Sequence, residues 1–365
     1  GDGLVNAGWG PNAAEHIVVA DLWTTAEPVP PNRARWAVMT SSTRPAKSSS
    51  PEGTPRARGP YFGWPVFVQK PFTYRQGIAA GIPARALRSV EFRQVLWGVY
   101  VHARVKIDGL MEARAIDCAL PDHAFASHLT AARVWGAVVP HTSHLHASVP
   151  RGRVRSSRAN LVVHSSVREP VTFRGIRVTS AVDTFLDCAR LLDLVDLVVL
   201  GDSLVKKKRT TPADLVAACE AASGRGARRA REAAALVRAG VDSGMETRAR
   251  LLRVLAGLPE LETDIRFYDD EGNLLRRLDA GDRSTRTAVE YDGRQHIDRQ
   301  ESWEADIERR EEFEDEEWRI VSLVSKDIFV TPGKTVERLR RIFRKRGISV
   351  GSPRDDWCRH FPGRD

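Results

Sequence analysis

The spacing of apolar and polar positions divides the chain into a part without periodicity and a longer part of short helices and strands. From Glu27 to Pro60, proline and serine are so frequent that neither the helical period nor the strand period can supply an apolar face. We therefore expect residues 1–65 to form a disordered tail. From residue 66 onward apolar residues recur at helical or strand spacing, which predicts an α+β protein of several domains.

Residues 66–105 show two helical patterns followed by a strand pair. Thr73 is the expected N-cap of a helix over Phe72–Ala80, and Gly81 its stop. A second helix is expected to start at Pro83. The following stretch, FRQVLWGVYVHA, alternates as in a β-hairpin with its bend at Gly98. Two helices and a hairpin in this order predict a winged helix-turn-helix.

The second helix of such a fold enters the major groove of DNA with basic side chains on its outer face. Its apolar stripe is expected to consist of Ala86, Leu87 and Val90. The candidate DNA-contacting residues beside that stripe are Arg85, Arg88 and Arg93. The alternative is a solvated face of an ordinary bundle helix.

Residues 106–240 combine strand and helix patterns and predict an α+β middle module. A helix is expected over Asp122–Val134, and after it come three strands and then a series of helices. The expected strands are His144–Val149, Asn160–His164 and Val171–Val178.

Residues 243–347 predict the element order α, β, β, β, α, β, α, a mixed sheet flanked by helices. Ser243 has the spacing of an N-cap to Glu246, as in a capping box. The fifth element is expected as a charged helix over Glu301–Glu314. Residues 348–365 are expected to be a tail.

Acidic residues in this part fall on two consecutive strands. Leu274–Leu278 and Ala288–Tyr291 predict a hairpin, with Asp279 near its turn and Glu290 on its second strand. Oxygen ligands that converge from adjacent strands suit Mg2+ or Mn2+, and such an ion can activate water beside a phosphodiester. The sequence thus predicts a metal site formed by Asp279 and Glu290.

Each acid also has a structural explanation. Glu246 can serve only as a cap, and Asp279 and Asp292 can serve as turn residues. Glu290 can pair with Arg276 or Arg286.

A family resemblance covers about residues 243–346. Glu246 in a helix, Asp279, the run VEYDGRQH ending at His296, and the downstream Asp306, Arg309 and Trp318 resemble the DUF559 domain. That domain is a Vsr-like branch of the PD-(D/E)XK nuclease superfamily. The resemblance implies that Asp279 and Glu290 bind the metal, that Glu246 is an accessory carboxylate, and that His296 lies near the attacking water or the phosphate.

The chain departs from the superfamily pattern at one position of this site. Asp292 stands where the superfamily's lysine is expected, so His296, Arg294 or Arg309 would have to supply the positive charge. The candidate catalytic residues are therefore Glu246, Asp279, Glu290, Asp292 and His296, and Arg294 and Arg309 join the candidate DNA contacts.

The N-terminal part is similar to AbiEi-like type IV antitoxins. The stretches that carry the resemblance are FTYRQGIAAGIPARALRS, FRQVLWGVYV and SHLTAARVWG. It implies DNA binding by the winged helix, often at the family's own promoter, and a cognate toxin protein as a partner. It transfers no catalytic residue.

Composition narrows the class of partner and the compartment. The formal net charge is +9, from 56 Lys and Arg against 47 Asp and Glu, which favours polyanions such as DNA. Four widely spaced cysteines argue against a disulfide framework or a zinc site and favour a reducing, cytoplasmic compartment. No apolar run is long enough to predict a membrane span.

Two functions follow from these patterns. The first is a DNA-binding protein with a Mg2+-dependent endonuclease-like domain that hydrolyses phosphodiesters. The second is an AbiEi-like antitoxin or transcriptional regulator whose nuclease-like domain is catalytically inactive.

Overall fold

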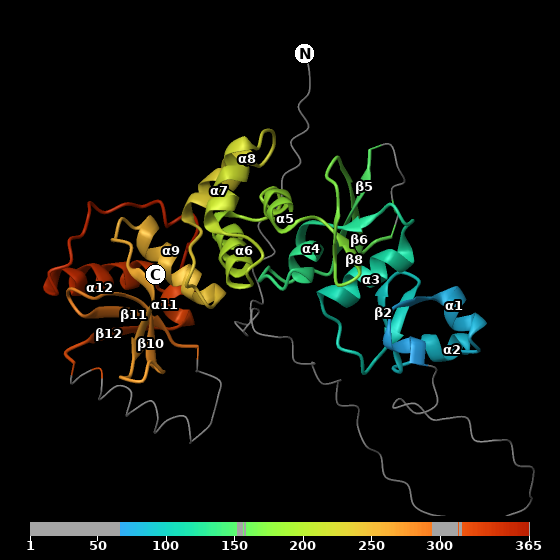
Figure 1. Ribbon diagram of the computed structural model, residues 1–365, viewed down its shortest axis with the longest axis horizontal. Coiled ribbons are helices and arrows are strands. Elements are labelled where there is room, and N and C mark those ends of the chain that lie inside the picture. Colours follow the sequence, from blue (N-terminus) through green and yellow to red (C-terminus); the bar gives the residue numbers. More distant parts are fainter. Residues whose placement is uncertain (1–65, 152–155, 157, 294–312, 314–315, 365) are drawn as a thin grey trace, which may run out of the picture. The chain divides into compact units, whose positions relative to one another are not determined.

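The computed structural model describes residues 66–151, 156, 158–293, 313 and 316–364 (Figure 1). The predicted tail over residues 1–65 lies outside the described residues. So do His296, Arg294, Arg309 and nearly all of the predicted helix over Glu301–Glu314.

The first described part consists of short helices packed on a small antiparallel sheet. Its elements are η1 (Val66–Gln69), β1 (Phe72–Thr73), α1 (Tyr74–Ala79), α2 (Ala84–Leu87), β2 (Phe92–Leu96) and β3 (Val99–His102). The strand order is β1-β3-β2. Thr73 caps α1 in a capping box with Gln76, and β2 and β3 form the predicted hairpin.

The second helix of this part is shorter than its apolar spacing predicts. Val90 was expected in the apolar stripe, but it is 93% exposed. The helix ends at Leu87, and the Ser89 hydroxyl donates a hydrogen bond to the Ala86 carbonyl oxygen. Because the backbone has left the helix before Val90, the buried position passes to Phe92 instead.

A five-stranded mixed sheet with the order β6-β5-β4-β8-β7 follows. Its strands and adjacent helices are α3 (Gly109–Ala119), β4 (Phe125–Ala126), α4 (His128–Val134), β5 (Leu145–Pro150), β6 (Leu161–Ser166), β7 (Val171–Phe173) and β8 (Ile176–Val178). The predicted helix over Asp122–Val134 was wrong before residue 128. Phe125 and Ala126 pair with β5 on one side and Ala126 with β8 on the other, so the sheet takes this backbone.

The next helices agree with the predicted pattern. They are α5 (Ala181–Cys188), α6 (Leu194–Lys206), α7 (Pro212–Ala221) and α8 (Ala227–Leu236). Side chains of Ser180, Asp193 and Thr211 cap three of them. Leu197 and Leu251, on either side of the predicted boundary at residues 240–243, belong to one buried apolar cluster. The predicted middle and C-terminal modules therefore share a core.

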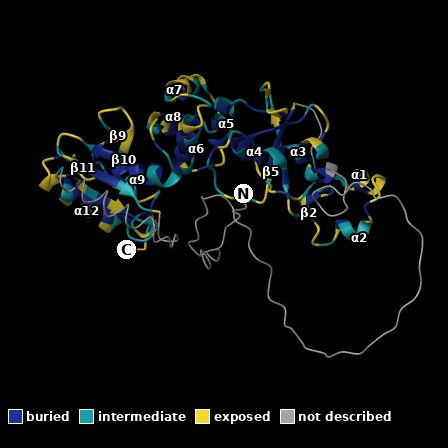
Figure 2. Cartoon of the chain, turned by 60° about the horizontal axis from the view of Figure 1, so that its bottom comes forward, coloured by how far each residue is buried: buried dark blue, intermediate teal, exposed yellow. Residues whose placement is uncertain are grey.

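The C-terminal part is a helix-flanked sheet with the strand order β12-β11-β10-β9. Its elements are α9 (Gly244–Leu255), β9 (Glu262–Tyr268), β10 (Leu274–Asp282), β11 (Thr287–Tyr291), β12 (Arg319–Leu323), α11 (Ser325–Phe329) and α12 (Pro332–Lys345). The predicted hairpin is β10 and β11, and β12 runs parallel to β11. Buried positions are concentrated in these strands and on the inner sides of the helices (Figure 2).

Residues 348–364 pack onto this part instead of forming the expected tail. Ile348 and Phe361 are buried in the same apolar cluster as α9 and α12. The Arg354 amide donates a hydrogen bond to the Ala256 carbonyl oxygen, so this segment covers the end of α9.

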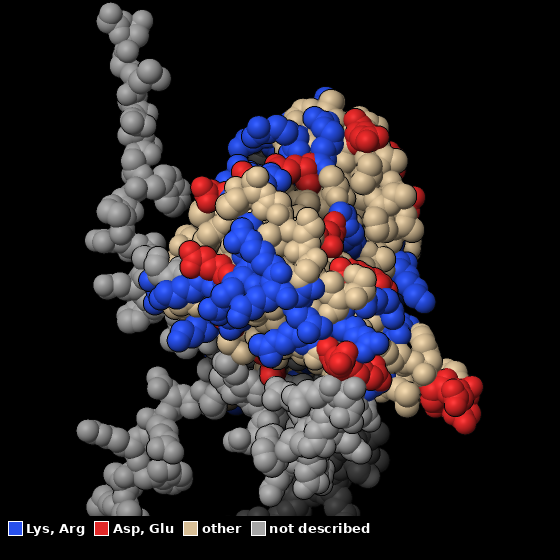
Figure 3. Space-filling view, turned by 90° about the vertical axis from the view of Figure 1, so that its left-hand side faces the viewer, with Lys and Arg blue, Asp and Glu red and all other residues tan. Residues whose placement is uncertain are grey.

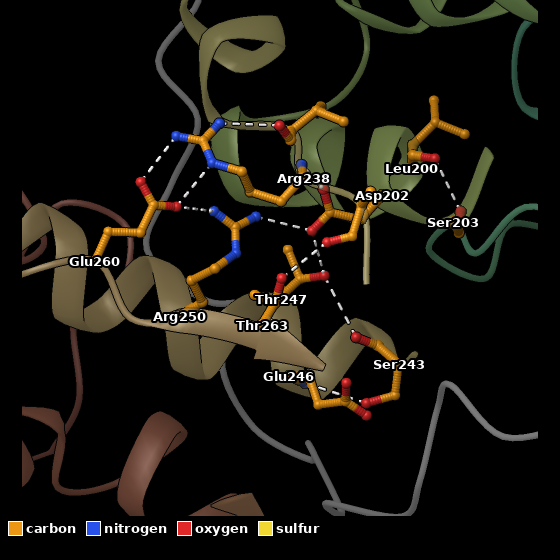
Figure 4. A network of polar contacts seen from close by, with 12 residues as sticks. Leu200, Asp202, Ser203, Arg238, Ser243, Glu246, Thr247, Arg250, Glu260 and Thr263 are labelled. Carbon is orange, nitrogen blue, oxygen red and sulfur yellow. Dashed lines mark hydrogen bonds and ion pairs between the residues drawn. The ribbon is translucent and has the colours of Figure 1, made fainter. Parts of the chain in front are cut away.

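A buried polar network joins α6 to α9 (Figure 4). Asp202 on α6 accepts hydrogen bonds from the Arg250 guanidinium at 2.8 Å and from the Thr247 hydroxyl at 2.9 Å. The Arg238 amide supplies a third bond at 2.8 Å. The Asp202 and Arg250 side chains are each only 2% exposed. Since both charges have lost their water, these bonds hold the two helices at one relative rotation.

Replacing Arg250 with methionine should destabilise the protein strongly. The substitution leaves the Asp202 carboxylate buried without its cation, which costs about 3–5 kcal/mol in comparable sites. Urea denaturation would measure this loss. The double variant Asp202→Asn with Arg250→Met should recover part of it, and a double variant no more stable than Arg250→Met would argue against the ion pair.

Candidate active site

The first turn of α9 fixes the Glu246 carboxylate. The Ser243 hydroxyl accepts a hydrogen bond from the Glu246 amide at 3.1 Å, as the predicted cap requires. The Glu246 carboxylate in turn accepts one from the Asp242 amide at 2.8 Å. It reaches one residue further back than in a capping box. Glu246 thus has a structural role that also holds its carboxylate at the start of the helix.

Strand β10 departs from regular alternation at Asp279. Leu278 packs in the apolar cluster that contains Phe313 and Trp318, whereas Ala280 packs in the cluster that contains α9. Two residues of a regular strand that are separated by one should share a face. On β9, Asp264 lies between the partners of Leu278 and Ala280 and has a φ of 57°. Such local irregularities re-aim one side chain of a strand.

Because of this irregularity, Asp279 and the next residue, Ala280, both lie on the α9 side of the sheet. The Asp279 carboxylate accepts a hydrogen bond from the Tyr291 amide of β11 at 3.0 Å. Glu246 and Asp279 line one small cavity of about 10 Å³, together with Tyr291 and the buried arginines Arg250 and Arg253. That volume holds roughly one water molecule. Two carboxylates far apart in the sequence therefore meet at a space that suits a single small ligand.

The proximity of the two acids changes the acidity of Glu246. Burial, and then the negative charge of Asp279, raise the pKa of Glu246 to about 7. Hydrogen bonds from Asp242 and Ser243 oppose this shift and do not overcome it. Near neutral pH the Glu246 carboxyl is therefore divided between its protonated and ionised forms.

Arg277 supplies positive charge next to these acids. Its guanidinium donates a hydrogen bond to the Asp242 carboxylate, and its Nε lies 3.7 Å from Asp264. Burial acts to lower the pKa of Arg277, but the bond to Asp242 and the charges of Asp242, Glu246 and Asp264 raise it overall. The side chain is 32% exposed, so a ligand can reach it.

Asp242 is held ionised by two cations. Burial acts to raise the pKa of Asp242, but hydrogen bonds from Arg277 and Lys206 outweigh it, and the net pKa is lowered. Neither Arg277 nor Asp242 was among the site residues predicted from the sequence. The signal for Arg277 was its position two residues before Asp279 on a strand.

Glu290 lies on the strand next to Asp279, but on the other face of the sheet. Val289 and Tyr291 pack on the α9 side, and the Tyr291 hydroxyl lies 2.7 Å from the Ser325 hydroxyl oxygen. Alternation along β11 therefore turns Glu290 away from α9. Asp292 follows the strand, and its amide donates a hydrogen bond to the Leu323 carbonyl oxygen.

The structure thus brings together Glu246 and Asp279 from the predicted set. Within the described ranges, no group of three or more His, Cys, Asp or Glu side chains is arranged to hold a metal ion. Because His296 lies outside those ranges, the complete predicted site stays a prediction.

The predicted DNA-contacting arginines differ in their environment. Arg85 and Arg88 are exposed on and just after α2. Arg93 is exposed on β2, but its guanidinium donates a hydrogen bond to the Val105 carbonyl oxygen. Arg93 therefore braces the chain after β3, while Arg85 and Arg88 present their charge to solvent.

Comparisons with known proteins give relatives but no family. No family model matches the chain. Two uncharacterized proteins of Mycobacterium tuberculosis, MT2308 of strain CDC 1551 / Oshkosh and Rv2248 of strain H37Rv, are each 27% identical over 250 residues. The match covers 68% of this chain and 91% of each relative.

One solved structure was also found by comparison of folds. The crystal structure of the RV2827C protein from the same species is 14% identical in sequence. The match covers 50% of this chain and 77% of that protein, with a TM-score of 0.30.

In the part of the chain that the structure describes, every helix is too short or too polar to cross a bilayer.

The raised pKa of Glu246 predicts a pH-dependent difference in stability for Glu246→Gln. The folded protein keeps a proton that an unfolded glutamate, with an ordinary pKa of 4.5, releases at lower pH. Stability from this proton is present below pH 4.5 and is lost as the pH rises through about 7. Relative to wild type, the melting temperature of Glu246→Gln should therefore increase between these two pH values.

Calorimetry at a series of pH values would measure this difference. Glu262→Gln, which changes a half-exposed carboxylate on β9, is the matched control and should show no such trend. A constant difference between Glu246→Gln and wild type would mean that Glu246 ionises like a surface glutamate.

Proposed function

We propose that the C-terminal part, residues 243–347, is a metal-dependent phosphodiesterase that acts on DNA. The observation that carries this proposal is the meeting of Glu246 and Asp279 at one small cavity, with Arg277 near Glu246. Convergent carboxylates with an adjacent cation are the groups that phosphodiester hydrolysis needs. The resemblance to the DUF559 domain supports the same activity.

Mg2+ or Mn2+ is the cofactor that this donor set fits. Both ions prefer hard oxygen ligands, and Glu246 and Asp279 offer carboxylates beside a space of water-molecule size. Asp279 and Glu246 would hold the ion, whereas the predicted ligand Glu290 lies on the opposite face of the sheet and would not reach it. When bound, such an ion lowers the pKa of a coordinated water and neutralises charge on a phosphate.

The chain's own residues position and charge the site. The Tyr291 amide holds Asp279, and the Asp242 amide holds Glu246, so neither carboxylate has to be oriented when substrate arrives. Glu246 must lose its proton before it can bind a cation, which makes the ionised site favoured above neutral pH. Arg277 supplies positive charge near Glu246 in a chain that has Asp292 at the position expected for lysine.

Nicking of supercoiled plasmid in the presence of Mg2+ or Mn2+ tests this proposal. Asp279→Asn should lower the rate by roughly a hundred-fold or more, because it removes a carboxylate that takes part in the reaction. Arg277→Gln should lower it too, and Arg277→Lys should retain more activity than Arg277→Gln. Asp269→Asn, in the exposed turn between β9 and β10, is the control. Equal rates for wild type and Asp279→Asn would reject the proposed site.

We also infer that residues 66–105 form a winged helix-turn-helix that binds DNA, as expected of an AbiEi-like regulator. The observation that favours it is the pair of exposed arginines, Arg85 and Arg88, at a short helix followed by the β2–β3 hairpin. In this second function the nuclease-like part is inactive. A cognate toxin stays a predicted partner.

The double variant Arg85→Ala with Arg88→Ala should lose the electrophoretic shift of DNA from upstream of its own gene. Loss of both side chains removes base and phosphate contacts of the second helix, at about 1–3 kcal/mol for each base contact. Arg225→Ala with Arg228→Ala removes the same charge from the start of α8 and should bind as wild type does. Retained binding in the first variant would argue against the assignment.

A further inference from the structure

Helix α12 carries basic residues on both its buried and its exposed sides, and the two sets have different surroundings. Its sequence, PGKTVERLRRIFRK, contains six Lys and Arg residues and a single acid, Glu337. Val336, Leu339 and Phe343 are buried on one side. On that side Arg340 donates hydrogen bonds to the carbonyl oxygens of Ala256 and Gly351, so its charge serves packing.

The other basic side chains form a stripe along the outer face of α12. Lys334, Arg338, Arg341 and Lys345 follow one another at spacings of four, three and four residues, which is one face of a helix. At about 1.5 Å per residue the stripe extends for roughly 16 Å. Figure 3 shows Lys and Arg gathered into a broad band on the side of the molecule where α12 lies, with most Asp and Glu at its margins.

Two residues of this stripe offer their charge outward. Arg341 and Lys345 are exposed, and within the described part of the chain no ion pair to either is found. Arg338 is 37% exposed and shares its charge with Asp327 at 3.4 Å. Arg344 is exposed on the flank of the stripe. The face therefore keeps a net positive charge after its internal pairs are counted.

We propose that this stripe of α12 binds the phosphate backbone of double-stranded DNA, independently of sequence. A duplex presents one phosphate charge per about 1.7 Å of its axis, so a straight row of this length can reach several phosphates. Backbone contacts of this kind fix position on the duplex and carry no base information. The inference rests on the proposed function in that it takes DNA as the partner.

Two other polyanions fit the stripe less well. A basic amphipathic helix binds an anionic membrane most strongly when it also inserts its apolar side. Here Val336, Leu339 and Phe343 are already buried in the core. Single-stranded nucleic acid is usually held by aromatic side chains on which bases stack, and the exposed stripe consists of Lys and Arg.

The test is the salt dependence of binding to a short duplex of arbitrary sequence, measured by fluorescence anisotropy with the full chain and without divalent cations. For Arg341→Gln with Lys345→Gln, the slope of log affinity against log salt should be shallower than in wild type by about two units. Affinity at low salt should fall by about ten-fold or more. Arg225→Gln with Arg228→Gln removes the same charge elsewhere and should change neither quantity.

Three results would overturn the inference. They are an unchanged slope in the α12 variant, an equal change in the α8 control, or equal or tighter binding of single strands than of duplex. A lower melting temperature of the α12 variant would indicate misfolding. In that case the single variant Lys345→Gln is measured instead of the double variant, and its expected slope change is about one unit.

The two proposals can fail separately. Plasmid nicking by wild type combined with an unchanged slope would reject the α12 surface and leave the hydrolytic site standing. A shallower slope in the α12 variant, together with no metal-dependent nicking by wild type, would support the α12 surface and reject the hydrolytic site.

Discussion

The buried ion pair between Asp202 and Arg250 is the contact on which the geometry of the candidate site depends. Removing an acid and a base almost completely from water costs free energy, and further hydrogen bonds to either group offset part of that cost. Thr247 and the Arg238 amide supply such bonds to Asp202. On Arg250, Nη1 lies 3.5 Å from Glu260, but among the described residues neither Nη1 nor Nε has a hydrogen-bond partner. The directional bonds allow α9 one rotation about its axis relative to α6.

That rotation determines where Glu246 points. Glu246 lies one turn before Arg250 on α9, and residues four apart share a face of a helix. Glu246 therefore lies on the side of α9 that also carries Arg250, and from this side it points toward the strands. On the sheet side, β10 presents Asp279 to the same cavity that Glu246 lines. Two independent constraints, the rotation of a helix and the position of Asp279 on β10, thus bring the acids together.

Bringing two carboxylates to one small cavity is unfavourable unless a proton or a cation lies between them. The protein without ligand resolves this by keeping Glu246 partly protonated, with a pKa of about 7. Burial that shifts a pKa toward the working range is typical of functional sites, although structural networks can produce it too. Arg277 and Lys206 hold the neighbouring Asp242 ionised. The unfavourable repulsion between carboxylates is therefore confined to Glu246 and Asp279, the pair that could bind a ligand.

Periodicity predicted most helices and strands, because they follow local spacing and capping. Ser243 as the cap of α9 and the β10–β11 hairpin are examples. The orientation of Glu290 could not be predicted, since it depends on which face of β11 the core takes. The proximity of Asp279 to Glu246 was equally inaccessible, because it depends on how α9 packs against the sheet. Phe125 and Ala126 were misassigned because strands distant in the sequence determine their conformation.

Net charge was the least local of the predictions, and the structure shows why it does not by itself locate a binding surface. Arg250, Arg253 and Arg340 are all buried, and burial lowers the pKa of Arg253 to about 10. These arginines join helices and cap carbonyl oxygens, so they add to the formal charge without presenting it to a partner. When these buried arginines are left out of the charge count, the basic residues on the outer side of α12 remain as charge that a polyanion can reach. The side of a helix on which an arginine lies, more than the number of arginines, decides whether it serves the core or a ligand.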